Sequence, residues 1–191
     1  MPDEMPAKAS EPRERLLRTA ADLFYREGIK GVGVDRVLSE AGVTRATMYR
    51  HFAGKEALVA AYLDLEDATI KGYFATAEAA GGPPKELLER VIEGIAEDAR
   101  RYHNRGCPFI NAAAEYGDPD SVVRRIVRRH RDWFRSALVA VAGAAGTADP
   151  DRVAAALVLL RDAALVGVYL DDEDEVVETF TTTARSIAGL P

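Results

Sequence analysis

The sequence lacks the features expected of a secreted or membrane protein. Its 191 residues contain one cysteine, so no intramolecular disulfide can form and an oxidising compartment is not implied. The longest unbroken apolar run, Val153–Leu160, is far shorter than the roughly 20 residues of a transmembrane helix. Charged Arg152 and Arg161 flank this run, and the N-terminus lacks the apolar stretch of a signal peptide. We therefore expect a cytoplasmic protein that does not contact a membrane.

Catalytic and metal-binding groups are also scarce. Serines are few, and most acidic side chains fall on faces of predicted helices that point to solvent. His103 and His130 are isolated imidazoles with no cysteine or second histidine at ligand spacing. Cys107 stands beside Arg105 just before a predicted helix, so a redox sensor and a buried small residue are both open interpretations. The sequence predicts no catalytic residue, no metal and no cofactor, with an all-helical enzyme and a protein-binding adaptor kept as alternatives.

Negative charge dominates the chain as a whole but not its N-terminal part. The formal net charge is −6. Residues 11–56 hold nine Lys or Arg against seven Asp or Glu, a net of +2, whereas residues 61–191 hold fifteen against twenty-two, a net of −7. Because an acidic surface repels phosphate groups, we expect a nucleic acid to meet only the N-terminal part.

Apolar residues recur at helical spacing along the chain, and neither alternating strand patterns nor internal repeats occur. The expected fold class is therefore all-α, with about nine helices. Residues 1–10 are predicted to be a flexible arm, 11–56 a three-helix domain and 57–191 a second helical domain. Helices are expected at about 12–27, 34–41, 44–53, 55–80, 85–103, 109–116, 121–142, 153–170 and 173–188.

A turn and a short polar helix follow the predicted helix 34–41. Gly42 takes a left-handed backbone without strain, and Thr44 can cap the helix that follows. The apolar residues Val43, Met48 and Phe52 fall at helical spacing and are expected to face inward. The remaining side chains are hydroxyls, an aromatic ring and cations, which suit phosphate oxygens and base edges: Thr44, Arg45, Thr47, Tyr49, Arg50, His51 and Lys55.

This order of helix, turn and polar-faced helix predicts a helix-turn-helix, whose second helix enters the major groove of duplex DNA. A solvated helix end of chance composition is the alternative interpretation. An ordered set of motifs favours the first: Ala20–Phe24, Gly28, Val37, Glu40–Thr44, Met48–Phe52 and Lys55–Leu58. With these motifs, the chain from about Arg13 to Leu58 resembles the DNA-binding domain of the TetR/AcrR family of transcriptional regulators.

The resemblance implies distinct roles on the DNA-binding helix. Arg45 and Thr47, near its N-terminal end, are expected to reach base edges, and Thr44 a base or a phosphate. Tyr49, His51 and Lys55 match family positions that usually hold the DNA backbone, while Arg50 has no assigned role. The sequence departs from the family at Gly33, where Ser or Thr usually caps the second helix and touches a phosphate.

Residues 57–191 are expected to bind an effector and to dimerise. The uniformly apolar segment 153–170 requires burial, in a large bundle or in a self-complementary interface. The family resemblance implies that the last two helices form the interface of a homodimer. The arginine run from Arg124 to Arg135 is interpreted as a solvated helix face, with a second anion site as the alternative.

Aromatic residues mixed with an amide and hydroxyls suit a small-molecule pocket. The candidate pocket residues are Tyr102, Phe109, Asn111, Tyr116, Trp133 and Phe134. The sequence thus predicts an N-terminal helix-turn-helix domain followed by a helical effector-binding and dimerisation domain. The expected function is a homodimeric transcriptional repressor, released from a palindromic DNA operator by a small molecule, and not an enzyme.

Overall fold

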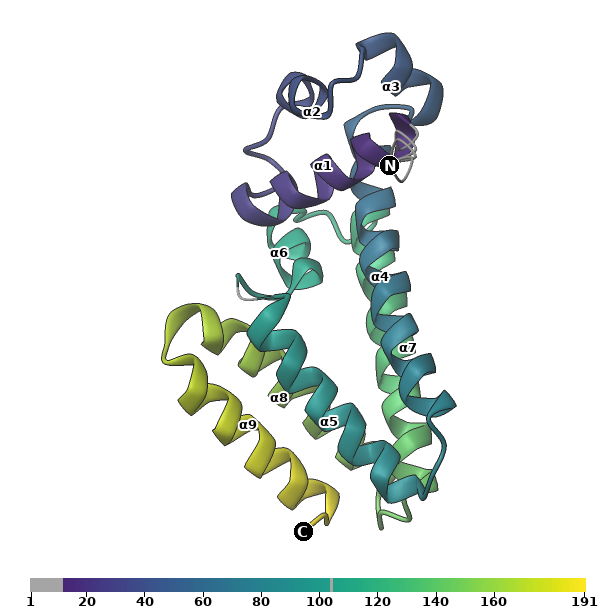
Figure 1. Ribbon diagram of the computed structural model, residues 1–191, viewed down its shortest axis with the longest axis vertical. Helices are drawn as coiled ribbons and strands as arrows, with labels where there is room; N and C mark the ends of the chain where they lie inside the picture. The colour runs from purple at the N-terminus through teal and green to yellow at the C-terminus, as the bar shows by residue number, and fades with distance from the viewer. Residues whose placement is uncertain (1–11, 104) are drawn as a thin grey trace, which may run out of the picture. The chain divides into compact units, whose positions relative to one another are not determined.

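The computed structural model describes residues 12–103 and 105–191, which form nine α-helices and no strand (Figure 1). The all-α prediction is confirmed, and the predicted arm at 1–10 lies outside the described residues. The helices are α1 (Pro12–Glu27), α2 (Val34–Ala41), α3 (Arg45–His51), α4 (Lys55–Ala79), α5 (Pro84–Arg101), α6 (Pro108–Glu115), α7 (Val122–Ala144), α8 (Pro150–Leu170) and α9 (Glu173–Ala188).

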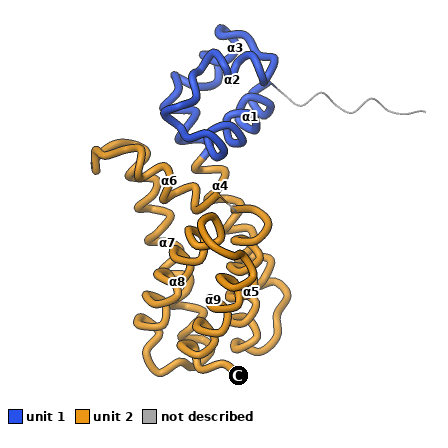
Figure 2. Tube along the Cα trace, turned by 90° about the vertical axis from the view of Figure 1, so that its left-hand side faces the viewer, with its two compact units in different colours: residues 1–62 blue, residues 63–191 orange. Residues whose placement is uncertain are grey.

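The chain divides into two compact units within α4, between Tyr62 and Leu63 (Figure 2). The division therefore lies six residues beyond the end of the predicted 11–56 domain. The first two turns of α4 belong to the N-terminal unit because they complete its core. Leu58 and Tyr62 are buried, and the Tyr62 ring centroid lies 6.1 Å from that of Phe24 on α1.

The N-terminal unit is built on α1, which packs against both α2 and α3. Gly42 ends α2 with a left-handed φ of 62°, and the Thr44 hydroxyl caps α3 by accepting a hydrogen bond from the Thr47 amide at 3.2 Å. Both features match the sequence prediction. However, α3 ends at His51, before Gly54, because Phe52 turns into an extended conformation that buries its ring.

The C-terminal unit is organised around α8, which packs mainly against α7 and α9 and also against α5. The second half of α4 lies alongside α7 (Figure 1), where Phe74 packs against Trp133 and Phe134. Prolines set the starts of two helices: α5 begins at Pro84, and α8 begins at Pro150. The Asp149 carboxylate also caps α8. Helix α8 is therefore longer than its unbroken apolar run, 153–160.

Helix α8 is long and apolar enough to cross a membrane when judged by length and composition alone. The core helix of a soluble protein meets the same criteria. In this unit α8 is packed among three other helices, and Arg161 in its middle is 4% exposed. One side of α8 nevertheless stays uncovered within the chain, since Leu159 is 70% and Leu170 68% exposed.

Candidate functional site

The α2–turn–α3 segment of the N-terminal unit presents a polar surface. Met48 is fully buried and anchors α3 on the core, so that the other side of the helix faces solvent. That side carries most of the predicted DNA-binding residues: Thr44, Arg45, Tyr49, Arg50 and His51 are exposed, and Thr47 is half-buried. The predicted side chains of α3 thus lie on the part of the helix surface that Met48 does not bury.

Several of these polar groups already contact one another. The Arg45 guanidinium forms an ion pair with Asp35 on α2. The hydroxyl oxygens of Thr44 and Thr47 lie 2.9 Å apart, and Arg50 Nη2 donates to the Thr47 hydroxyl at 3.1 Å. A base or phosphate that binds this face must therefore replace contacts within the protein, most directly the one between Arg45 and Asp35.

The residues at the two ends of the helix-turn-helix, Lys55 and Gly33, differ in the side-chain contacts that they make. Lys55, the first residue of α4, is half-buried with its ammonium 6.0 Å from the Phe24 ring centroid. Gly33 is the N-cap of α2 and provides no side-chain hydrogen bond. A Cβ at Gly33 would meet no atom within 4 Å, and its φ of −76° suits any residue. The N-cap hydrogen bond of α2 is therefore missing because residue 33 is glycine, and not because a larger side chain would fail to fit.

The C-terminal unit contains a cavity between α4, α5, α7 and α8 with about 60 Å³ of free space. An enclosed water needs about 10–15 Å³ by the same measure, so the space suits a few waters or a small organic group. Its walls are mainly apolar, and three charged side chains join them: Ile70, Phe74, Val91, Ile95 and Phe134 with Arg90, Asp98 and Arg161.

Of the six predicted pocket residues, only Phe134 lines this cavity. Phe109 is fully buried and stacks on the His130 ring at 3.7 Å, and Trp133 meets the wall residue Phe74 edge-on at 5.4 Å. The Asn111 amide donates to the Arg105 carbonyl at 3.2 Å.

The other two candidates lie nearer the surface. Tyr102 is 54% exposed beside Tyr73, and Tyr116 is half-buried, with its carbonyl accepting a hydrogen bond from Arg124. The wall residues of α4 and α5 were not among the predicted set because their apolar spacing is the same as that of ordinary core residues.

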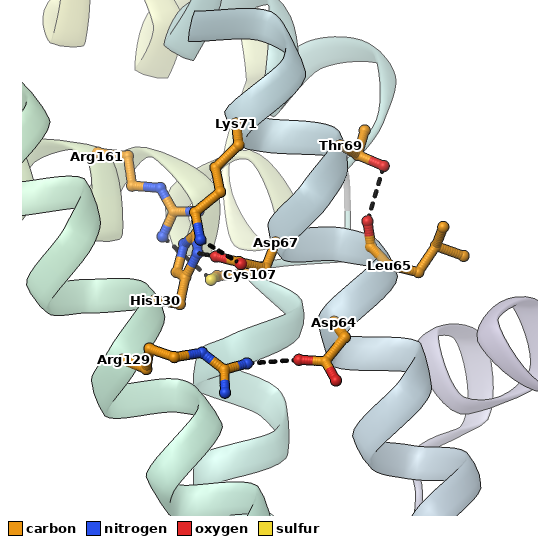
Figure 3. A network of polar contacts seen from close by, with 9 residues as sticks. All are labelled: Asp64, Leu65, Asp67, Thr69, Lys71, Cys107, Arg129, His130 and Arg161. Atoms are coloured by element: carbon orange, nitrogen blue, oxygen red, sulfur yellow. Dashed lines mark hydrogen bonds and ion pairs between the residues drawn. The ribbon is translucent and has the colours of Figure 1, made fainter. Parts of the chain in front are cut away.

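A network of polar side chains lies beside the cavity, between α4 and α7 (Figure 3). Asp67 accepts hydrogen bonds from Lys71 at 2.6 Å and from the His130 ring at 2.8 Å. Burial lowers the pKa of His130 to about 4, although Asp67 acts in the opposite direction. His130 is therefore neutral near pH 7, and its Nδ1–H donates to Asp67. Its Nε2 is buried and has no hydrogen-bond partner among the described residues.

Arg161 and Cys107 form the second part of this network. Arg161 Nη1 donates to the Cys107 sulfur at 3.1 Å and to Asp162 at 3.2 Å. Asp162 also accepts from Arg131 at 2.7 Å. Cys107 is fully buried, which agrees with the interpretation of this residue as a buried small side chain.

His103 is also paired with carboxylates. Its ring contacts Asp98 at 2.7 Å and Glu66 at 3.3 Å. Burial lowers the pKa of His103, but the hydrogen bonds and negative charges of the two carboxylates more than offset this effect and raise the pKa to about 9. The protonated ring ties the end of α5 to α4. Over the described residues, no group of three or more His, Cys, Asp or Glu is arranged to hold a metal ion.

The arginine run of α7 makes local contacts. Arg124, Arg125 and Arg128 donate to carbonyls of residues 116, 120 and 119, and so hold the loop before α7. Arg129 pairs with Asp64 and Arg131 with Asp162. The acidic segment 171–175 pairs through Glu173 and Asp174 with Arg100 on α5. These contacts account for five of the six arginines of the run without an anion site.

Comparison with known families gives two matches, which together cover most of the chain. Residues 16–62 match the model described as bacterial regulatory proteins, tetR family. Residues 84–184 match the model described as tetracyclin repressor-like, C-terminal domain. The first match covers α1 to the start of α4, and the second covers α5 to most of α9.

Similar proteins carry related descriptions. A solved TetR-family transcriptional regulator from Streptomyces coelicolor is 40% identical with a TM-score of 0.90, covering 94% of this chain and 95% of that one. The transcriptional regulator AcuR of Cereibacter sphaeroides is 26% identical over 92% of this chain and 84% of its own length. The HTH-type transcriptional regulator YerO of Bacillus subtilis is 32% identical over 48% of this chain, but only 32% of YerO is covered.

Proposed function

The chain belongs to the TetR family of bacterial transcriptional regulators, and from this membership we propose that it is a homodimeric, ligand-responsive repressor. In this proposal each subunit places α3 in the major groove of one half of a palindromic operator. A small-molecule effector bound in the C-terminal unit releases the operator. The protein acts in the cytoplasm and has no catalytic activity, in keeping with relatives that are regulators.

The observation that carries the proposal is the polar face of α3. Two arginines, hydroxyl groups, a tyrosine and a histidine lie on the solvent-accessible surface of this helix, which buried Met48 anchors. Arg45 and Thr47 lie near the start of α3, where side chains reach base edges in a helix-turn-helix. Tyr49, His51 and Lys55 are assigned to the DNA backbone, and Thr44 to a base or phosphate.

Dimerisation is supported by the uncovered sides of α8 and α9. Large apolar side chains there remain exposed in the single chain: Leu159, Val166, Tyr169, Leu170 and Ile187. A soluble protein rarely leaves such a group of apolar side chains in contact with water, and a second copy would cover it. Two copies would also present two α3 helices to the two half-sites of a palindrome, whose centres lie about 34–36 Å apart or at multiples of that distance.

The cavity supports effector binding, and α4 supports its coupling to DNA. Helix α4 starts in the N-terminal unit and continues without a break into the wall of the cavity. An effector that enlarges the cavity must displace a wall helix, and movement of α4 carries the helix-turn-helix with it. To release DNA the effector must bind the released geometry more tightly than the DNA-bound one. A coupling of about 1–3 kcal/mol gives a roughly 5- to 150-fold loss of operator affinity.

The proposal is tested by incubating the purified protein with sheared genomic DNA and sequencing the retained fragments. We expect a palindromic duplex to be enriched and to bind as one dimer. Its affinity should fall steeply with salt, because each neutralised phosphate contributes about −0.9 to the log–log slope. Recovery of no common sequence, or binding that is independent of salt, would contradict the proposal.

Two substitutions then test the roles on the recovered operator. Arg45→Ala should weaken the cognate site by about 1–3 kcal/mol if the contact is bidentate to guanine, and should leave random duplex nearly unchanged. Lys55→Ala should weaken both duplexes alike and reduce the salt slope by about one. Equal effects of the two substitutions on cognate and random DNA would show that the assignment is wrong.

A further inference from the structure

Arg161 is a buried cation whose hydrogen-bonding capacity is only partly used. Its side chain lines the cavity and is 4% exposed as a residue. A guanidinium presents five N–H donors. Within the described residues, its hydrogen bonds start from Nη1 alone, to the Cys107 sulfur and to Asp162. A thiol sulfur is a weak acceptor, so Asp162 is the one strong acceptor in this set.

The carboxylates close to Arg161 are each held by another cation. Asp162 lies 2.7 Å from Arg131. Asp67 lies 2.6 Å from Lys71, and Figure 3 shows this second pair. Asp98, which lines the same cavity, lies 2.7 Å from His103. Arg161 thus shares one carboxylate with Arg131 and has none of its own, an arrangement that is costly for a charge removed from water.

The Arg161 donors that make no hydrogen bond within the described residues, Nε and Nη2, have a fixed geometry. The central carbon of the guanidinium lies over the Phe134 ring, 5.3 Å from the ring centroid, in a cation–π contact. The donors Nε and Nη2 share one edge of the guanidinium plane, and their N–H groups are parallel. Two parallel N–H groups are the geometry that a carboxylate accepts in a bidentate pair.

The rest of the cavity is suited to the body of a small organic acid. Ile70, Phe74, Val91 and Ile95 offer apolar surface for a hydrocarbon chain or ring. Arg90 on α5 lines the same space, and its buried Nε has no hydrogen-bond partner among the described residues. The free space of about 60 Å³ favours a compact ligand over a large one.

We infer that the effector of this protein is a small carboxylic acid, whose carboxylate binds the Nε–Nη2 edge of Arg161 and whose apolar part lies between α4, α5 and α7. This inference rests on the proposed ligand-responsive function and names the chemical class of the ligand. The acid supplies the counter-charge that Arg161 lacks, and it contacts the wall that α4 helps to form.

The test uses the full-length wild-type protein with butanoate, hexanoate, benzoate and their uncharged amides. Trp133 lies 5.4 Å from the wall residue Phe74, so its fluorescence reports binding without DNA. We expect at least one acid to bind saturably and its amide to bind roughly 10- to 100-fold more weakly, since a charge-assisted pair is lost. Inorganic phosphate at the same concentration should not compete, because the apolar walls contribute nothing to its binding.

Two variants separate recognition from folding. Arg161→Met removes the guanidinium from the cavity and should reduce the affinity for the acid to that for the amide. Arg135→Met removes an exposed cation from α7 and should leave the affinity unchanged. If Arg161→Met fails to fold, Arg161→Lys replaces it; this variant keeps the charge but loses the bidentate edge, and should bind the acid at least several-fold more weakly.

The inference is overturned if no acid of the series binds, if acid and amide bind equally, or if the Arg161 variants retain wild-type affinity for the acid. Operator binding is measured separately on the same protein. Acid binding that depends on Arg161 but leaves operator affinity unchanged supports the ligand class and contradicts the proposed release mechanism. Operator binding without any acid binding contradicts the ligand class alone.

Discussion

The ion pair between Arg45 and Asp35 offers a direct way to test how α3 meets DNA. Arg45 is assigned to a base edge, yet in the free protein its guanidinium is held by Asp35 on α2. The pair is solvent-exposed, with 54% of the Arg45 side chain and 81% of the Asp35 side chain accessible. An exposed pair contributes about 0.2–1 kcal/mol, and this amount must be given up when Arg45 turns to DNA.

Asp35→Asn removes that cost while keeping the shape of the side chain. We expect affinity for the operator to rise by about 1.4- to 5-fold, the equivalent of 0.2–1 kcal/mol. Removing a carboxylate near phosphates adds to the gain. Protein stability should fall slightly, by about 0.3–1 kcal/mol, because Asp35 also lies in the first turn of α2, where a negative charge is favourable.

A double-mutant cycle on fluorescence anisotropy of labelled operator measures the coupling. In the Arg45→Ala background the gain from Asp35→Asn should shrink to the part due to phosphate repulsion. Asp22→Asn on α1 is the matched control, because Asp22 also forms an exposed pair with an arginine, Arg26. The reasoning is refuted if Asp35→Asn weakens operator binding, or if the gain is equally large when Arg45 is absent.

Three further predictions concern stability, pH and assembly. Gly33→Ser should raise the free energy of unfolding in urea by about 0.5–1 kcal/mol, since it adds the missing cap at a compatible backbone conformation. Gly42→Ser, at φ 62°, should lower the free energy of unfolding by about 1–2 kcal/mol. A lower free energy of unfolding for Gly33→Ser would contradict the capping argument. Stability should be greatest near pH 6.5. As pH rises toward 9, the stabilising protonated His103 is lost, at a cost of up to about 3 kcal/mol. As pH falls toward 4, buried neutral His130 must become charged. His103→Gln should flatten only the alkaline side of a urea-midpoint profile, and an unchanged alkaline side would argue against the raised pKa. Leu159→Glu should convert the proposed dimer to a monomer in light scattering with little loss of helix content. Val122→Glu, at an exposed site on α7, should not, and a dimer that persists in Leu159→Glu would place the interface elsewhere.

The helix-turn-helix could be derived from the sequence because its determinants are local. Gly42 must take a left-handed conformation, Thr44 can cap only the helix that follows, and Met48 repeats the apolar spacing of α3. Each of these depends on residues within a few positions along the chain. The same holds for the number of helices and for most of their ends, whereas the end of α3 depended on how the Phe52 ring reaches the core.

The cavity and the buried charges were decided by the tertiary structure. His130 and Asp67 are 63 residues apart, and Arg161 and Cys107 are 54 apart, so no local pattern predicts either contact. The sequence presents two isolated histidines, a lone cysteine and an arginine in an apolar helix. Packing gives one histidine a pKa of about 9 and the other about 4, and leaves part of Arg161 without a hydrogen-bond partner among the residues that the structure describes. Helical periodicity determines which side of a helix is apolar. The cavity between α4, α5, α7 and α8, and the donors left unpaired among the described residues, arise only where several such sides meet.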